Sequence, residues 1–474
     1  MGPVPALAER ADACASRLCE AERVLLASHI DADGLTSAAI ASTALARAGV
    51  AHEVCFKKQL DDAGIADIAD RGYNTVLFTD FGSGQLDDIT THEEAGDFEP
   101  VVADHHQPAD ATTAYHLNPL LEDIDGASEL SGAGTAYVLA RALAAADRES
   151  SADNRDLAAL AVVGAVGDMQ AVDGELVGAN RAIVEEGTGA GVIEEGTDLA
   201  LYGTQTRPLP KLLEYASEVR IPGVTNDEQG AVSFLEELPV DLHADGSWRR
   251  WVDLSHGEKR TVTSALLQRA ITRGVPAAKA ERLVGTTYTL THEQPGTELR
   301  DASEFSTLLN ATARYERADV GLAVCLGDRD AAFDRARELL DNHRRNLSEG
   351  LETVKRNGVE REEHVQWFDA GNEIRETIVG IVAGMALGVD GVDPDRPIVA
   401  FARKNDEETK VSARGTARLV GRGLDLSAVM GEASQAVGGD GGGHDVAAGA
   451  TVPTGREEAL VERADALVGE QLGQ

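Results

Sequence analysis

Short apolar runs alternate with longer, Ala-rich segments over the first 190 residues of the chain. The runs are short enough and rich enough in Val and Leu for strands, and they occupy residues 22–28, 54–56, 74–79 and 100–103. The longer segments have the length and small apolar faces of helices, at 34–48, 60–69, 134–146 and 156–166. This alternation predicts an α/β fold built on a parallel sheet.

Acidic and histidine residues directly follow four apolar runs. They are His29, Asp31 and Asp33 before Gly34; Asp80; the triplet Asp104, His105 and His106; and Asp168 after the run 162–166. In an open parallel sheet, ligands bind outside the carboxyl ends of the strands, so we expect these side chains in one crevice. The run 162–166 is ambiguous, because a short apolar run suits a strand or a buried helix.

Each cluster also has a purely structural interpretation. Asp33 would suit the N-cap of the following helix, and Asp80 and Asp168 are each typical of turns. The triplet at 104–106 is more specific, because adjacent histidines behind an acid are unusual in a solvated loop. Divalent cations prefer oxygen ligands, and Mn²⁺ also accepts imidazole. The four clusters in this order therefore predict a site for two divalent metal ions.

Two cations about 4 Å apart need a bridging carboxylate and separate ligands on each side. Asp80 is the candidate bridge. Asp168 and His105 would complete one metal, and His29 and Asp31 the other. Asp33 would ligate or hold the loop, and His106 would contact phosphate or a bound water. We predict that the triplet Asp104, His105 and His106 is catalytic, with Asp104 also among the metal ligands.

The pattern divides the rest of the chain into three parts. Residues 196–328 carry several prolines and read as an inserted domain, 329–357 as a charged connector helix, and 358–474 as a third unit. Within the insert, the segment 248–251 (Trp-Arg-Arg-Trp) suits either a core anchor or a surface that stacks on bases.

The third unit contains a candidate phosphate-binding half-site. Lys410, Ser412 and Arg414 alternate and would share one face of a strand. Gly442, Gly443 and His444 end a glycine-rich segment whose backbone N–H groups and imidazole can approach a phosphate. The alternative is a solvated strand followed by a flexible loop.

The net charge is −38, and lysine occurs at only 8 positions. Such a surface would repel nucleic acid or, in our preferred interpretation, keep the protein soluble in concentrated salt, where self-repulsion is screened. No apolar run reaches the ~18 residues of a membrane span. The N-terminus has no secretory pattern and the four cysteines no metal-type spacing, so we expect a cytoplasmic protein.

The order of these motifs resembles the DHH phosphoesterase family, and within it the RecJ-like branch. The motifs at 410–414 and 441–444 look like the DHHA1 domain that follows DHH domains, and segments at 220–225 and 315–327 resemble archaeal RecJ-like nucleases. With the acidic composition, the chain is similar to a haloarchaeal member. The resemblance implies a parallel-sheet DHH domain at 1–195, a mostly helical insert, and a smaller α/β DHHA1 domain across a cleft.

What the resemblance implies is stepwise hydrolysis of single-stranded DNA or RNA with Mn²⁺ or Mg²⁺, in replication or repair. It also implies association with the replicative helicase complex through GINS. Bacterial RecJ tends to have Asp where this chain has His29, which would favour Mn²⁺. The alternatives are a phosphodiesterase of short oligonucleotides or cyclic dinucleotides, a non-catalytic replisome scaffold, and an inorganic pyrophosphatase.

Overall fold

The computed structural model describes residues 2–146, 153–216, 219–389 and 391–473. It divides into two compact units, Met1–Arg337 and Glu338–Gln474, and each is described by itself. None of the described helices is both long and apolar enough to cross a membrane.

The first unit is built on a five-stranded parallel sheet, as the sequence predicts. The strand order is β2-β1-β3-β4-β5. The strands are β1 (Arg23–His29), β2 (Ala51–Lys57), β3 (Thr75–Thr79), β4 (Glu99–Ala103) and β5 (His116–Leu117). From β1 the chain builds outward to β2 on one side and to β3, β4 and β5 on the other. The boundary between β1 and β3 is therefore the point where open α/β sheets bind ligands.

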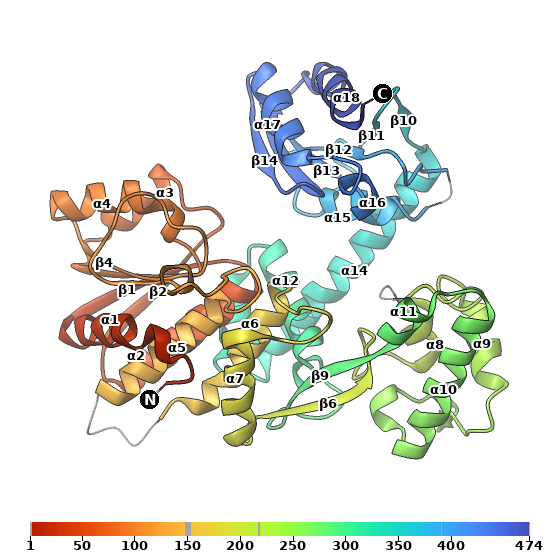
Figure 1. Cartoon of the computed structure of the whole chain (residues 1–474), viewed down its shortest axis with the longest axis horizontal. Coiled ribbons are helices and arrows are strands. Elements are labelled where there is room, and N and C mark those ends of the chain that lie inside the picture. Colours follow the sequence, from red (N-terminus) through yellow and green to blue (C-terminus); the bar gives the residue numbers. More distant parts are fainter. Residues whose placement is uncertain (1, 147–152, 217–218, 390, 474) are drawn as a thin grey trace. The chain divides into compact units, whose positions relative to one another are not determined.

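Helices cover both faces of this sheet (Figure 1). One face carries α3 (Asp62–Ala69) and α4 (Leu86–Ala95), and the other carries α1 (Ala8–Glu20), α2 (Ala32–Arg47) and α5 (Gly132–Ala146). Residues of β3 are buried throughout, including Val76, Leu77 and Phe78. Burial on both faces explains why these strands read as continuous apolar runs instead of an alternating pattern.

The apolar run 162–166, which suited a strand or a buried helix, is a helix, so the predicted helix at 156–166 is confirmed and the strand alternative was wrong. It lies within α6 (Ala158–Gly167), which packs on α2 and α5. Gly164 makes this packing possible, because a Cβ there would stand 2.4 Å from the Cβ of Ala133 and 2.4 Å from Asp33 Oδ1. The run belongs to a longer Ala-rich segment whose small side chains let three helices approach closely, which a short hydropathy pattern does not reveal.

The rest of the first unit consists of the insert and the helices and strands that precede and follow it. α7 (Gly178–Gly189) leads to β6 (Ile193–Leu199), which pairs antiparallel with β9 (Val284–Leu290). Between these strands lie α8 (Leu209–Glu214), α9 (Glu228–Glu236), α10 (His256–Thr272) and α11 (Ala277–Ala280). The mostly helical insert is therefore confirmed. After β9 the chain continues into α12 (Ala302–Arg314) and α13 (Ala318–Cys325).

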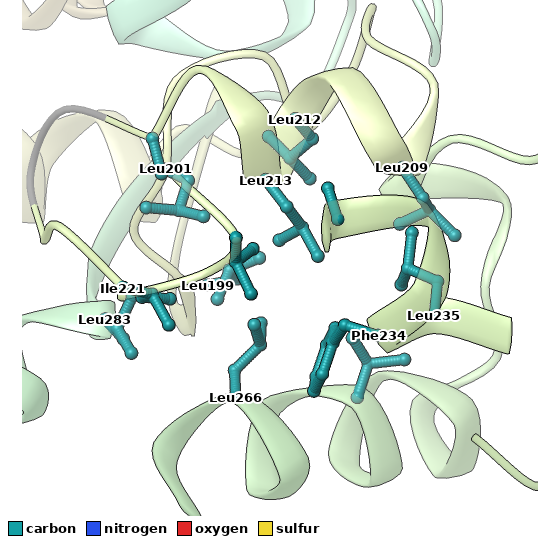
Figure 2. Packing of buried hydrophobic residues seen from close by; sticks show 14 of the residues in the cluster. Leu199, Leu201, Leu209, Leu212, Leu213, Ile221, Phe234, Leu235, Leu266 and Leu283 are labelled. Atoms are coloured by element: carbon teal, nitrogen blue, oxygen red, sulfur yellow. The ribbon is translucent and has the colours of Figure 1, made fainter. Parts of the chain in front are cut away.

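The insert has its own hydrophobic core, in which leucines from its helices meet Phe234 and Ile221 (Figure 2). Trp251 is buried in this core, and its indole N–H donates to Asp198. Arg249 and Arg250 pair with Glu258 and Asp253. The segment 248–251 is thus a core anchor with paired arginines, as one of its two interpretations held.

The second unit contains a six-stranded mixed sheet of order β10-β11-β12-β13-β15-β14. Its strands are β10 (Glu360–Arg361), β11 (Gln366–Asp369), β12 (Ile398–Arg403), β13 (Glu408–Arg414), β14 (Asp440–Gly443) and β15 (Ala447–Pro453). One face of this sheet packs against α15 (Val379–Ala386) and forms a hydrophobic core with it. The other face forms a second core with α16 (Ala417–Val420), α17 (Leu426–Ala436) and α18 (Glu457–Leu472). The connector predicted at 329–357 is the long helix α14 (Ala331–Asn357), which crosses the division between the units.

A buried carboxylate joins the insert to α12. Glu304 is fully buried and accepts hydrogen bonds from the backbone N–H of Gln205 and the hydroxyl of Thr206. Burial raises the pKa of Glu304 to about 7, and those two hydrogen bonds oppose the rise. Its usual pKa is 4.5, so between these values the folded state holds a proton that the unfolded chain releases.

We therefore expect the wild type to lose stability relative to Glu304→Gln as the pH rises from about 4.5 to about 7. Linkage sets the loss on the order of 3 kcal/mol. Urea unfolding followed by tryptophan fluorescence measures the difference between the two proteins at each pH. Glu236→Gln, at an exposed position of α9, should follow the wild type. Parallel pH curves for wild type and Glu304→Gln would contradict the assignment.

Candidate metal centre

The first cluster lies where β1 turns into α2. Asp31 is the N-cap of α2, and its carboxylate accepts from the backbone N–H of Gly34 at 3.0 Å. The sequence had suggested Asp33 as the N-cap of this helix, and that interpretation was wrong. Gly34 is needed because a Cβ there would stand 2.2 Å from the carbonyl oxygen of His29. This tight turn keeps His29 and Asp31 together, with His29 Nδ1 3.1 Å from Asp31 Oδ2.

Asp33 points inward from the first turn of α2. Its two carboxylate oxygens accept from the backbone N–H groups of Gly132, at 2.7 Å, and Ala133, at 2.9 Å. These groups begin α5, whose N-terminal N–H groups lack partners within the helix and attract negative charge. Asp33 thus ties two helix N-termini together, which supports its predicted role in holding the loop.

Asp80 follows β3 and adopts the left-handed conformation, with φ of 59°. Its backbone N–H donates to the carbonyl of Ala103 on the neighbouring strand. The buried carboxylate lies between two imidazoles, 3.6 Å from His29 Nδ1 and 3.3 Å from His105 Nε2. Gly132 leaves room for it, because a Cβ at residue 132 would stand 2.3 Å from Asp80 Oδ1.

The triplet follows β4. Asp104 is fully buried, and its oxygens accept from the backbone N–H groups of Ser83 and His105, at 2.9 and 2.8 Å. The same carboxylate contacts His106 Nδ1 at 2.8 Å. These bonds already use both oxygens of Asp104, so its observed environment is that of a group that orients its neighbours. The ring of His106 is largely exposed.

His105 presents the atom that best fits a metal ligand. Its Nδ1 lies 2.6 Å from the carbonyl oxygen of Gly126 and therefore carries the proton. The buried Nε2 has no hydrogen-bond partner within the described ranges, although it faces oxygens of Asp80, Asp33 and Asp168 at 3.3, 3.8 and 3.8 Å. In the neutral ring, a lone pair would face three carboxylates. A divalent cation would satisfy the imidazole and the carboxylates, and metal-bound imidazoles usually donate their other N–H to such a carbonyl.

Asp168 reaches this cluster from the C-terminus of α6, and it is held by a relay that the sequence interpretation missed. Gln170 Nε2 donates to Asp168 Oδ2 at 2.9 Å and to the carbonyl of Gly126 at 2.8 Å. Asn180 of α7 donates in turn to Gln170 Oε1 at 2.6 Å. A single Gln or Asn belongs to no recognisable sequence motif. The only feature of the sequence that pointed to Gln170 was its position two residues after Asp168.

The chain after the insert also contacts the site. Asn310 of α12 accepts from the backbone N–H of Ala32 at 3.1 Å, directly between Asp31 and Asp33. A Cβ at Gly167 would stand 3.2 Å from Ser306 Cβ, so α12 packs closely against the end of α6. Residues 278 positions apart thus brace one loop, and no local pattern predicts this.

The electrostatics of the cluster call for positive charge. Burial and the carboxylates of Asp80 and Asp168 raise the pKa of Asp33, and burial likewise raises that of Asp168. Burial alone would lower the pKa of His105, but Asp80 raises it to about 11. Burial would raise the pKa of Asp80, but the nearby imidazoles of His105 and His29 hold it below its usual value. Protonated histidines or bound cations must therefore neutralise these carboxylates.

Among the residues that the structure describes, three groups of His, Asp or Glu side chains have ligand atoms within 4.8 Å of one another. They are His29, Asp31 and Asp80; Asp33, His105 and Asp168; and Asp80, Asp104, His105 and His106. The structure thus brings all the residues predicted as metal ligands into adjacent groups. Asp80 belongs to two of these groups, which is the position a bridging carboxylate would take. The mixed oxygen and imidazole donors fit Mn²⁺, and the carboxylates also suit Mg²⁺.

The predicted half-site of the second unit lies on β13 and β14. Lys410, Ser412 and Arg414 alternate along β13, and Arg414 Nη1 donates to the carbonyls of Ala413 and Ala448. Gly380 of α15 lies against this face, where a Cβ would stand 2.5 Å from Arg414 Nη2. The three side chains therefore share a face, as predicted.

The glycine-rich segment is a strand, not a flexible loop. β14 pairs antiparallel with β15, in register Gly442 with Gly449 and Gly443 with Ala448. The backbone N–H of His444 donates to the carbonyl of Ala447 at 2.9 Å, so this group already has a partner. The imidazole of His444 is exposed.

Three family models match the chain. The DHH family, N-terminal domain, matches residues 23–165, the DHH-CID domain 201–284, and the DHHA1 domain 364–470. An uncharacterized protein of Methanocaldococcus jannaschii is 29% identical over 452 residues, which cover 94% of this chain and 93% of that protein. These matches confirm the predicted resemblance to DHH and DHHA1 domains.

Solved structures share the fold over nearly the whole chain. Exonuclease RecJ bound to manganese has a TM-score of 0.61 at 19% identity, covering 99% of this chain and 96% of that one. Thermus thermophilus RecJ in complex with Mn²⁺ gives the same TM-score and identity, but this chain spans only 55% of its length. CDC45 from Entamoeba histolytica has a TM-score of 0.64 at 10% identity, covering 98% of both chains.

Gly132→Ala tests the packing of the site without removing a ligand. The added methyl group would press on Asp80 and displace the N–H that binds Asp33. We expect Mn²⁺ affinity, measured by titration calorimetry, to fall by about 10- to 100-fold, the range for groups that support metal ligands. Gly257→Ala, which has open space around it, is the matched control. Equal affinity in both variants, with intact circular dichroism, would contradict this placement of the metal site.

Proposed function

We propose that this chain, in which DHH, DHH-CID and DHHA1 family models match three segments, is a metal-dependent exonuclease of single-stranded DNA or RNA. The observation that carries the proposal is the buried Nε2 of His105, which has no hydrogen-bond partner among the described residues. This atom faces three carboxylates near the carboxyl ends of β1 and β3. Paired cations held at such an edge are suited to phosphoryl transfer.

In this proposal His29, Asp31 and Asp80 would hold one divalent cation, and Asp33, His105 and Asp168 would hold the other. Asp80, which lies 3.3 Å from His105 Nε2, is the proposed shared ligand. RecJ proteins of the same fold were crystallised with Mn²⁺ and with Mg²⁺, which supports either ion here. When bound, the cations would supply Lewis-acid activation of water and neutralise charge on the phosphoryl oxygens.

The chain's own groups orient the substrate. The carboxylate of Asp104 fixes the ring of His106 through Nδ1 and, by that contact, raises the pKa of His106. The raised pKa favours the protonated form of this largely exposed ring, in which Nε2 can donate to a phosphoryl oxygen. The ring centroids of His105 and His106 lie 4.2 Å apart, so a phosphate bound by His106 would lie next to the metal-binding cluster.

Binding of the strand is assigned to the second unit. The residues proposed to contact substrate there are Lys410, Ser412, Arg414, Gly442, Gly443 and His444. Arg414 suits this role because its planar guanidinium offers paired N–H donors to phosphate oxygens. The face that it shares with Lys410 and Ser412 supports a common ligand.

The alternatives share the same catalytic cluster. A phosphodiesterase of short oligonucleotides or cyclic dinucleotides would use the same ligands on a smaller substrate. A non-catalytic scaffold would be expected to lose ligands, whereas every predicted one is present and gathered. The likeness to CDC45 supports the further proposal that the chain takes part in a replication assembly, with GINS as the proposed partner.

Asp80→Asn should abolish release of mononucleotides from end-labelled single-stranded DNA or RNA in Mn²⁺. The change removes the shared carboxylate charge but keeps its shape, so the fold should remain. We expect a loss of at least about 1,000-fold in turnover, as for other essential catalytic electrostatic groups. Asp87→Asn, at an exposed position of α4, serves as the control. Normal turnover by Asp80→Asn would refute the assignment, and cleavage of dinucleotides alone by the wild type would favour the small-substrate alternative.

Arg414→Ala should weaken binding of a single strand more than it slows a saturated enzyme. The expected result is an increase in KM of about 10-fold with kcat little changed, since a phosphate contact contributes about 1–2 kcal/mol. Arg422→Ala, at an exposed position of the same unit, is the matched control. A defect confined to kcat would count against a binding role for Arg414.

A further inference from the structure

A pocket of about 470 Å³ in the insert gathers four cationic side chains. They come from three segments of the chain: Arg220 precedes α9, Arg273 follows α10, and Lys279 and Arg282 lie in and after α11. The other lining residues are glycine, proline and valine, and no described acidic or aromatic residue lines the pocket. The protein carries a net charge of −38, so this is a strong local excess of positive charge.

These cations lack the partners that neighbouring basic residues have. Lys211, Arg249 and Lys259 of the same insert pair with Glu214, Glu258 and Asp198. In the described part of the chain, no hydrogen bond or ion pair is made by the side chains of Arg220, Arg273, Lys279 or Arg282. Four unneutralised charges around one pocket repel one another, so a bound anion would stabilise them.

The backbone that carries the cations is anchored in the core of the insert. Arg220 precedes Ile221, Lys279 precedes Ala280, and Arg282 precedes Leu283, and all three neighbours are buried in that core. Figure 2 shows Ile221 and Leu283 on the same side of the cluster. The side chains are exposed but their attachment points are fixed, which lowers the entropic cost of ordering them on a ligand.

A structural role accounts for only part of the set. Arg273 lies at the C-terminus of α10, where a cation stabilises the helix dipole. Arg220 lies in no helix, and α11 has only four residues and therefore little dipole. The convergence of four cations on one pocket thus needs another explanation.

We propose that this pocket binds phosphate groups of a single-stranded nucleic acid, as an anchoring point separate from the metal centre. The proposal deepens the proposed function and rests on it for the identity of the strand. Guanidinium groups match phosphate oxygens with paired donors, and a strand offers phosphates at regular intervals. Without aromatic side chains the pocket has no stacking platform, so it reads the backbone and not the bases. The acidic surface elsewhere would confine a polyanion to such sites.

The test compares two double variants that each remove two positive charges. Arg220→Gln with Arg282→Gln changes the pocket, and Arg260→Gln with Arg314→Gln changes exposed positions outside it. The probe is a fluorescent oligothymidylate of about 30 nucleotides, long enough for more than one contact region. Anisotropy is measured in EDTA, which prevents hydrolysis, over the KCl range in which circular dichroism shows intact fold.

The pocket variant should bind about 10-fold more weakly than wild type, and its slope of log affinity against log salt should fall by about 1.4 for two lost phosphate contacts. The control variant should match wild type. Equal weakening in both variants, or in neither, overturns the proposal. If the pocket variant instead loses affinity only for an oligoglutamate probe, the ligand is an acidic protein segment and the proposal also falls.

These outcomes are separable from the proposed nuclease activity. A wild type that hydrolyses no strand, but whose pocket variant binds the oligothymidylate more weakly, would refute the exonuclease and leave the pocket standing. A nuclease whose pocket variants bind normally would refute the pocket alone.

Discussion

The crowding of carboxylates at one edge of the parallel sheet is the constraint around which the first unit is organised. Asp33 and Asp80 are buried, and Asp168 and His105 lie against them. Bringing like charges together out of water is costly unless donors or cations surround them. The fold supplies part of this compensation through the N-terminus of α5, and the histidines supply more. The buried Nε2 of His105, which faces three of these carboxylates without a hydrogen-bond partner among the described residues, is where a cation fits best.

Close packing of small residues makes this arrangement possible. Gly132 and Gly164 stand where a methyl group would collide with Asp80 and Asp33, and Gly126 stands against the carbonyl of His105. The same Ala- and Gly-rich composition lets α2, α5 and α6 approach closely enough for Asp33 to contact the start of α5. The glycines of this unit are therefore as necessary for the geometry of the metal site as the acidic residues are.

Charge is distributed unevenly along this acidic chain. Several basic residues of the insert pair with nearby carboxylates, as Arg249 does with Glu258. The pocket at 219–222 and 273–282 is an exception, and β13 presents Lys410 and Arg414 on one face. A polyanionic substrate would meet repulsion over most of the surface and attraction at such places, so net charge by itself says little about what the protein binds.

The sequence alone determined the parallel sheet, the helical insert and nearly all the candidate ligands, because strand-length apolar runs and the residues after them are local features. His29, Asp80 and the triplet 104–106 were predictable, since parallel strands end at one edge. Only the tertiary structure decided between helix and strand for 162–166, and only it showed that Asp31 and not Asp33 is the N-cap and that Gln170 and Asn310 brace the site. These outcomes depend on helix packing and on hydrogen bonds between residues distant in the chain, which no local pattern encodes.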